Sequence, residues 1–185
     1  MQTQSLDISA NRNSDKYTAT ENLRRVFWSM LYPFFRFSPR ICFRWRAFLL
    51  RLFGAKIGKN VNIYNTAVIY LPWNLEIGEW SAIGECAYIY NLGKITIGRQ
   101  VTISQRAHLC AGTHDFTKRD MPLIKPPIFI GDQAWVCADA FVGPNVTVGM
   151  GAVIGARAVV TEDTSGWAIV AGNPARTIGK REIFD

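Results

Sequence analysis

A period of six residues dominates the hydrophobic pattern from Ile57 onward. An aliphatic residue opens each of fifteen hexads, and the fifth position is Val, Ala, Ser, Thr or Gly in fourteen of them, with Trp73 as the exception. The second position is Gly in eight hexads. The opening residues are Ile57, Ile63, Ile69, Ile77, Ile83, Ile89, Ile97, Ile103, Leu109, Ile130, Val136, Val142, Val148, Ile154 and Val160. A repeat that keeps its phase over this length predicts a solenoid.

Each hexad predicts one short strand followed by a tight corner. The aliphatic side chain points inward, and Gly supplies conformations that a Cβ atom forbids, so three hexads form one triangular coil. Stacked coils pair their strands in parallel at about 4.8 Å. The spacing predicts five coils, beginning at residues 57, 77, 97, 130 and 148, and an excursion loop over 115–129. An ordinary β-sandwich would alternate with period two and does not match this pattern.

The chain before the repeat is different in character. Residues 22–53 hold ten of the 23 aromatic residues and seven arginines, without a single acid. Pro33 and Pro39 are expected to divide this stretch into two helices. The expected parts of the chain are a flexible N-terminal arm (1–20), a basic aromatic helical segment (21–54), the β-helix (55–165) and a C-terminal extension (166–185).

The charge distribution narrows the classes of partner. The net charge of +7 belongs to residues 1–59, since residues 60–185 are close to neutral, so nucleic-acid binding is not expected. Arginines interrupt every apolar run of 22–53, which therefore does not predict a membrane span. Two readings stay open for this segment: a lid on the exposed first coil, or a surface in the membrane interface near anionic headgroups and a lipid-linked acceptor.

The cysteines and the first residues bear on the compartment. The four cysteines are widely spread and form no C-x-x-C pair, which argues against a metal finger or a thioredoxin-like site. The first twenty residues are polar and do not have the apolar centre of a signal peptide. We expect a cytoplasmic protein with free thiols, peripheral at the inner face of the cell membrane if 22–53 contacts lipid.

The hexads have the form of the hexapeptide-repeat acyltransferases, over roughly residues 55–180. Three motifs, Thr113-His114-Asp115, Ile130-Gly-Asp-Gln-Ala-Trp135 and Ala171-Gly-Asn-Pro-Ala-Arg176, resemble the branch of maltose, galactoside and nodulation-factor O-acetyltransferases. The N-terminal segment is most similar to that of colanic acid biosynthesis acetyltransferases. The resemblance implies an all-β, left-handed parallel β-helix of about five triangular coils with an N-terminal α-helical segment. It also implies acetyl transfer from acetyl-CoA to a sugar hydroxyl in surface polysaccharide biosynthesis, with no metal.

The resemblance implies that His114 is the base that deprotonates the acceptor hydroxyl. A near-neutral imidazole suits that task, although a lone histidine at an outward corner could also be a solvated turn residue. Asp115 could orient the imidazole as acids do in catalytic triads, or it could only help to form the turn. His108 has no role in the family and is expected at the surface.

The residues on the acetyl-CoA side also follow from the resemblance. Trp135 would lie beside the pantetheine arm, or pack between subunits. Ala138 and Ala156 would stack one coil apart and leave a track of free N–H groups, and the N–H of Ala138 would steady the oxyanion. Arg176 would meet the 3′-phosphate. The residues that match the adenosine end are Thr161, Asn173, Pro174, Arg176 and Lys180.

One departure and several rivals remain. The sugar enzymes carry an asparagine where this chain has Gly84, and Glu85 and Asn91 are the candidates to replace it in binding the acceptor. His114 and Trp135 fall at different corners of the triangle, which predicts a site shared between subunits of a homotrimer. A γ-class carbonic anhydrase needs three histidines and this chain has two. An N-acetyltransferase of an amino sugar and a non-catalytic glycan-binding or scaffold protein stay open as alternatives.

Overall fold

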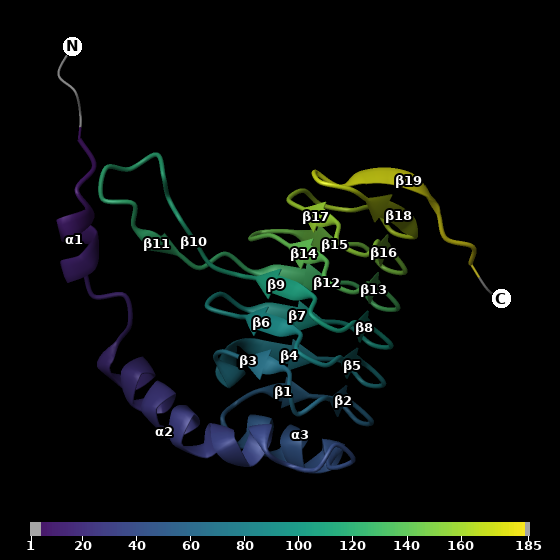
Figure 1. Cartoon of the computed structure of the whole chain (residues 1–185), viewed down its shortest axis with the longest axis horizontal. Coiled ribbons are helices and arrows are strands. Elements are labelled where there is room, and N and C mark those ends of the chain that lie inside the picture. Colours follow the sequence, from purple (N-terminus) through teal and green to yellow (C-terminus); the bar gives the residue numbers. More distant parts are fainter. Residues whose placement is uncertain (1–4, 184–185) are drawn as a thin grey trace.

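The computed structural model describes residues 5–183 and shows a three-faced prism of parallel strands with helices beneath one end (Figure 1). Face A consists of β1 (Lys56–Ile57), β4 (Leu75–Ile77), β7 (Ile95–Ile97), β12 (Ile128–Ile130) and β15 (Thr147–Val148). Face B consists of β2 (Asn62–Ile63), β5 (Ala82–Ile83), β8 (Thr102–Ile103), β13 (Trp135–Val136), β16 (Val153–Ile154), β18 (Ala168–Ala171) and β19 (Arg176–Lys180). Face C consists of β3 (Val68–Ile69), β6 (Tyr88–Tyr90), β9 (His108–Cys110), β14 (Phe141–Val142) and β17 (Val159–Val160).

The β-helix and its inward residues are confirmed. Successive coils pair in parallel with one hexad opener above another, as Ile57 pairs with Ile77. All fifteen opening residues are at most 8% exposed. The exception at the fifth position, Trp73, lies in a short 3₁₀ turn, η1 (Pro72–Asn74). The prism does not end at residue 165 as predicted, because β18 pairs in parallel with β16 and starts a sixth coil.

The hexad glycines act by making room for the adjacent coil. A Cβ atom on Gly58 would lie 2.5 Å from the backbone nitrogen of Glu79, and Gly78 is equally crowded by Arg99. Neither glycine has a positive φ. The left-handed conformation falls instead two residues later, on non-glycine residues such as Asn60, with φ 55°. The prediction that glycine supplies this conformation is therefore wrong at these corners, and close packing between coils explains the pattern.

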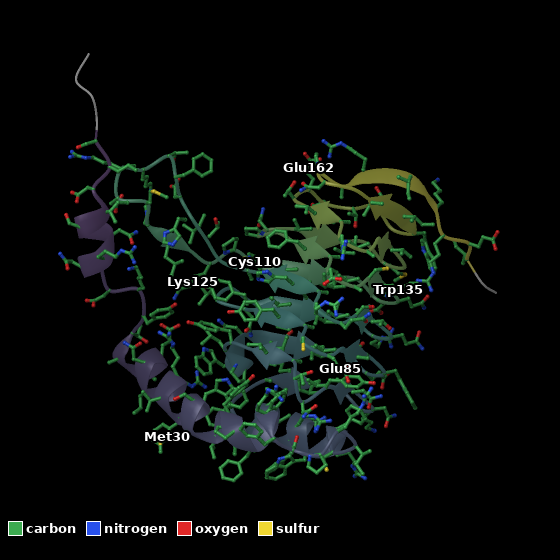
Figure 2. The ribbon with its side chains drawn as sticks, viewed as in Figure 1. Met30, Glu85, Cys110, Lys125, Trp135 and Glu162 are labelled. Carbon is green, nitrogen blue, oxygen red and sulfur yellow. The ribbon has the colours of Figure 1, made fainter. Side chains whose placement is uncertain are left out.

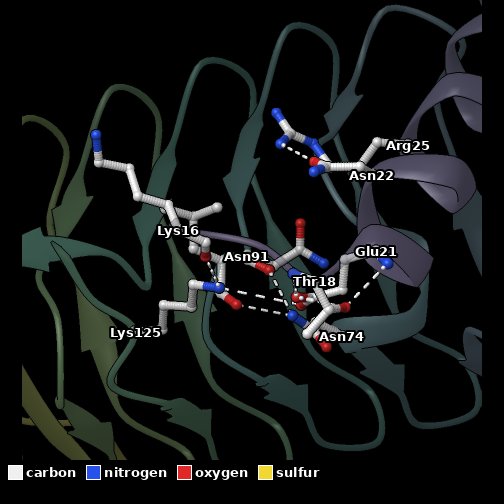
Figure 3. Close-up of polar contacts among 9 residues, drawn as sticks. Lys16, Thr18, Glu21, Asn22, Arg25, Asn74, Asn91 and Lys125 are labelled. Atoms are coloured by element: carbon white, nitrogen blue, oxygen red, sulfur yellow. Dashed lines mark hydrogen bonds and ion pairs between the residues drawn. The ribbon is translucent and has the colours of Figure 1, made fainter. Parts of the chain in front are cut away.

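Three helices precede the prism: α1 (Ile8–Asn13), α2 (Ala19–Arg36) and α3 (Phe43–Leu52). Thr18 and Glu21 form a capping box at the start of α2 (Figure 3). The predicted two helices are confirmed, and Pro39 lies in the connection between them, whereas Pro33 lies within α2 and does not divide it. The bond that Pro33 cannot make would involve the carbonyl of Ser29, an exposed residue, so water can satisfy it.

The helices α2 and α3 cap the first coil, as one of the two readings predicted. In the prism, carbonyls of the hexad openers accept from the preceding coil, as Ile77 does from Gly58. The first coil has no preceding coil, and one helix side chain serves each of its faces. These donors are Trp28 Nε1 to Ile69 O (3.1 Å), Arg46 Nε to Ile63 O (2.5 Å) and Arg51 Nε to Ile57 O (3.0 Å). Arg46 is wholly buried, whereas Arg44 of the same helix is exposed.

The excursion is a hairpin that contacts the N-terminal residues. Strands β10 (Thr113–His114) and β11 (Leu123–Ile124) pair antiparallel. Asp7 N donates to Arg119 O at 2.9 Å. Lys125 Nζ donates to Lys16 O at 2.9 Å (Figure 3). Residues 5–20, predicted as a flexible arm, are therefore tied to the hairpin, whereas residues 1–4 of that arm lie outside the described residues.

Candidate functional site

His114 lies on the hairpin where it leaves the corner between faces C and A. Its side chain is exposed, and it lines a pocket of about 320 Å³ together with Tyr17, Tyr90 and the α1 residue Asn11. Its Nδ1 atom lies 2.7 Å from the carbonyl oxygen of Met121. A carbonyl only accepts, so Nδ1 carries the proton and Nε2 keeps a free lone pair. This is the tautomer that a general base acting through Nε2 requires.

A buried asparagine holds that carbonyl in place. The amide of Asn11 donates to Asp120 O at 2.8 Å and also to Met121 O. Met121 has a positive φ of 43°, so its carbonyl direction depends on an uncommon backbone conformation. Sequence reasoning missed Asn11 and Met121, because the contact joins residues 110 positions apart and neither residue belongs to a motif.

Asp115 has a different role from the orienting acid that was considered. Its Oδ1 accepts from the Thr117 hydroxyl at 2.6 Å and from the Thr117 N–H at 3.1 Å. These bonds lower the pKa of Asp115 and keep it ionised. The side chain forms no hydrogen bond to His114. Asp115 therefore shapes the hairpin turn, and the imidazole is oriented by the Met121 carbonyl instead.

The predicted track lies at the corner between faces B and C. Ala138 and Ala156 stack one coil apart, since Arg157 N donates to Ala138 O at 3.0 Å. The N–H groups of Ala138 and Ala156 have no acceptor within residues 5–183. Trp135, on adjacent face B, is 45% exposed and donates from Nε1 to Ser104 Oγ at 2.9 Å. An extended ligand with acceptor groups would find free donors here.

The residues predicted for the adenosine end gather after the last complete coil. Thr161 follows β17, and Asn173 and Pro174 form the turn between β18 and β19. Arg176 and Lys180 stand at the two ends of β19 and are exposed. Arg176 makes one hydrogen bond, to the neighbouring Ala175 carbonyl at 2.8 Å, so most of its guanidinium donors are open to an anionic group.

Neither of the two residues proposed to replace the family asparagine lines the His114 pocket. Asn91 is wholly buried, and its amide bonds both the N–H and the carbonyl of Leu71, so the structure corrects this prediction by giving it a structural role. Glu85 lies at the corner of the track and pairs with Arg40 at 2.9 Å. At Gly84 a Cβ atom would lie 2.8 Å from the Gln105 backbone nitrogen, so the backbone leaves no room for an asparagine there.

His108 is not the surface residue that was expected. Its ring packs edge-on against Tyr88 and Phe141, with centroids 4.9 Å and 5.2 Å away. Its Nε2 atom is buried and has no hydrogen-bond partner among the described residues. Burial lowers the pKa of His108, which keeps the ring neutral inside this aromatic strip.

Comparison with known proteins identifies the family of the chain. A family model described as "Bacterial transferase hexapeptide (six repeats)" matches residues 127–162. Colanic acid biosynthesis acetyltransferase WcaF of Escherichia coli (strain K12) is 43% identical over 157 residues, which cover 85% of this chain and 86% of the relative. The chain belongs to the hexapeptide-repeat acetyltransferases.

Solved structures confirm the fold of this acetyltransferase. A hexapeptide-repeat acetyltransferase from Vibrio cholerae, solved with acetyl coenzyme A, superposes with a TM-score of 0.81 at 22% identity, covering 91% of this chain and 93% of the other. A galactoside acetyltransferase in complex with coenzyme A gives a TM-score of 0.83 at 24% identity, covering 95% and 89%.

Within one chain of the acetyltransferase, the two groups of site residues are separated. His114 leaves from the corner between faces C and A, whereas Ala138 and Ala156 lie at the corner between faces B and C. Figure 2 shows Trp135 on the opposite side of the prism from Lys125, which follows the hairpin. Six residues of chain cross face C from one corner to the other. At about 3.3 Å per residue, the distance between the two corners is well over 10 Å.

Proposed function

We propose that the protein is an acetyl-CoA-dependent O-acetyltransferase that acts on a sugar hydroxyl in bacterial surface polysaccharide biosynthesis. The observation that carries the proposal is the 2.7 Å bond from His114 Nδ1 to Met121 O, which leaves Nε2 as a free base in a pocket. The names of the relatives support the rest: one is a colanic acid biosynthesis protein, and two solved neighbours hold acetyl coenzyme A or coenzyme A.

In the proposed reaction, His114 Nε2 accepts the proton of the acceptor hydroxyl as its oxygen attacks the thioester carbonyl. The N–H of Ala138 donates to the oxyanion that forms. The C–S bond then breaks, and the imidazolium returns the proton to the leaving thiolate. Transfer is direct in this reaction, and no acyl-enzyme is formed. Burial raises the pKa of the Cys110 and Cys137 thiols, which makes these two residues poor nucleophiles.

The same geometry supports a homotrimer. The base and the track lie on different corners of one prism, so a reacting pair must combine His114 of one subunit with Trp135 and Ala138 of its neighbour. A cyclic trimer provides three such clefts.

The test compares His114→Ala with His108→Phe, a matched change at the other histidine. With acetyl-CoA and a panel of sugar acceptors, His114→Ala should lower kcat by about 10²–10⁴-fold at unchanged acetyl-CoA affinity, whereas His108→Phe should retain kcat. Retention of more than a tenth of kcat in His114→Ala would remove this base from the mechanism. Transfer only to amino sugars would identify an N-acetyltransferase, and binding without turnover would identify a glycan-binding protein.

A further inference from the structure

The helices that cap the first coil leave an apolar surface open. Ten of the twenty exposed large apolar residues of the described chain fall between positions 23 and 52, with exposures from 42% to 84%. We call this set the outward stripe, and it consists of Leu23, Val26, Phe27, Met30, Phe34, Phe37, Ile41, Trp45, Phe48 and Leu52. Figure 2 shows Met30 on the side of α2 turned away from the prism.

Helix α2 has two apolar faces, and the fold uses only one. Trp28, Tyr32 and Phe35 pack against the hydrophobic core of the prism. The stripe residues of α2 follow helical spacing on the opposite side, as Leu23, Phe27 and Phe34 illustrate. A surface helix of a globular protein needs one apolar stripe for packing, so the second stripe has no task in folding.

The two helices present one continuous surface. The indole N–H of Trp45 on α3 donates to the carbonyl of Phe34 on α2 at 3.1 Å, and the Trp45 ring stacks on Phe48 with centroids 5.8 Å apart. These contacts join the stripe of α3 to that of α2. The resulting surface covers the end of the molecule beneath the first coil (Figure 1).

Basic residues predominate along the segment that carries the stripe, although Glu21 lies in the first turn of α2. Residues 22–75 contain nine lysines and arginines and no aspartate or glutamate. Arg36 and Arg44 flank the stripe and form no ion pair within the described chain, whereas Arg40 pairs with Glu85. Pairing this surface with a second copy would bring like charges together. An anionic lipid surface offers acyl chains to the apolar side chains of the stripe and negatively charged headgroups to the arginines.

We infer that the outward stripe and its arginines lie in the interface of an anionic phospholipid bilayer. Within residues 5–183, no helix is long and apolar enough to cross a bilayer, and amphipathic helices of this kind rest in the headgroup region with their apolar side chains among the acyl chains. The capping side chains Trp28 and Arg46 hold the helices to the first coil from the other side.

This placement also indicates which class of acceptor receives the acetyl group, and this step rests on the proposed function. His114 belongs to the third coil, so it would stand about 20 Å above the lipid, from two coil spacings and one helix diameter. A groove of about 620 Å³ lies between α2 and face C and is lined by Arg25, Val26 and Tyr70. The ring of Tyr70 packs against that of Tyr90, which lines the His114 pocket, with ring centroids 5.1 Å apart. A sugar linked through phosphate to a membrane lipid would reach the base along this side.

The experiment is vesicle flotation of the full-length protein. Wild type should float with phosphatidylcholine vesicles that contain phosphatidylglycerol, and less with phosphatidylcholine alone or as salt rises. Met30→Gln with Phe34→Gln and Phe48→Gln should abolish flotation without lowering the melting temperature, because these side chains are exposed. Arg36→Gln with Arg44→Gln should weaken partition about tenfold or more.

The matched control is Phe129→Gln with Met150→Gln, two similarly exposed apolar residues on other parts of the prism, which should float like wild type. All variants should keep wild-type turnover on a soluble sugar acceptor, so failure of flotation is distinguishable from failure of the proposed reaction. Wild type that does not float would overturn the inference, as would a triple variant that still floats. If the triple variant instead changes the sedimentation coefficient, the stripe is a contact between copies and the membrane inference is wrong.

Discussion

Subunit mixing tests whether two chains build each active site. The first variant is His114→Ala, which removes the base. The second combines Trp135→Ala with Ala138→Asp, which removes the exposed indole and places a carboxylate at a free N–H of the track. Each homotrimer should be inactive, because every site would lack either its base or its acetyl-CoA track.

The expected recovery follows from the geometry. In the proposed trimer, each site takes its base from one subunit and its track from the next, because the two lie on different corners of one prism. In a cyclic trimer that contains both variants, whichever is in excess, one junction joins an intact base to an intact track. Hybrid trimers should therefore regain about one third of wild-type kcat per trimer. If one chain held both parts, no junction would recover.

The assay uses two affinity tags, one on each variant, with coexpression and sequential purification of doubly tagged trimers. Acceptor-dependent release of the coenzyme A thiol gives the rate, and native mass spectrometry verifies the subunit composition. Each variant purified alone sets the background. Confirmed hybrids with only background activity would refute the shared site, and so would an active monomer in the wild-type preparation.

Three further predictions concern single positions. Asn11→Ala should lower kcat about tenfold with the KM for acetyl-CoA unchanged. The reason is that the Met121 carbonyl would lose the hydrogen bond from Asn11, and His114 would then lose its fixed orientation. An unaltered kcat would show that the asparagine only stabilises the hairpin. Arg46→Met should lower the free energy of unfolding by about 3 kcal/mol, or the melting temperature by about 6–12 °C, because it leaves the Ile63 carbonyl unpaired. The control Arg44→Met, at an exposed position, should change the free energy of unfolding by no more than about 0.5 kcal/mol in denaturant unfolding. Burial lowers the pKa of His108, so the free energy of unfolding should be constant with respect to this group above about pH 6.5 and should fall below it, by at most about 1.4 kcal/mol per pH unit. His108→Phe should make the free energy of unfolding less dependent on pH in this range. Equal slopes in the two proteins would contradict the prediction.

The repeat could be predicted because each hexad encodes its own strand and corner. Ile57 and Ile77 open successive coils and are buried for the same local reason, and no distant contact is needed to determine which side chain points inward. The same regularity located Ala138 and Ala156 at one corner. What repeats along the chain is predictable, because a solenoid residue contacts mainly its own coil and the two adjacent coils.

The positioning of His114 could not be predicted in the same way. The motif Thr113-His114-Asp115 suggested an acidic partner next in sequence, yet Asp115 bonds Thr117, and the imidazole bonds a carbonyl seven residues away. Support for that carbonyl comes from Asn11, across the gap between the N-terminal helix and the hairpin. Neither segment repeats, so their pairing is a tertiary contact with no periodic signal.

The burial of Arg46 could have been predicted from a physical rule, although not from composition. By composition it is one of seven arginines in 22–53, and nothing local separates it from exposed Arg44. The difference comes from the prism, whose first coil has no preceding coil to donate to the carbonyls of its hexad openers. Buried carbonyls must be paired, so the helices that cover this coil have to supply a donor to the opener carbonyl on each face. Trp28, Arg46 and Arg51 are those donors. Arg36 and Arg44 have no such carbonyl to bind, and they flank the outward stripe, where they would contact the anionic headgroups of the proposed lipid surface.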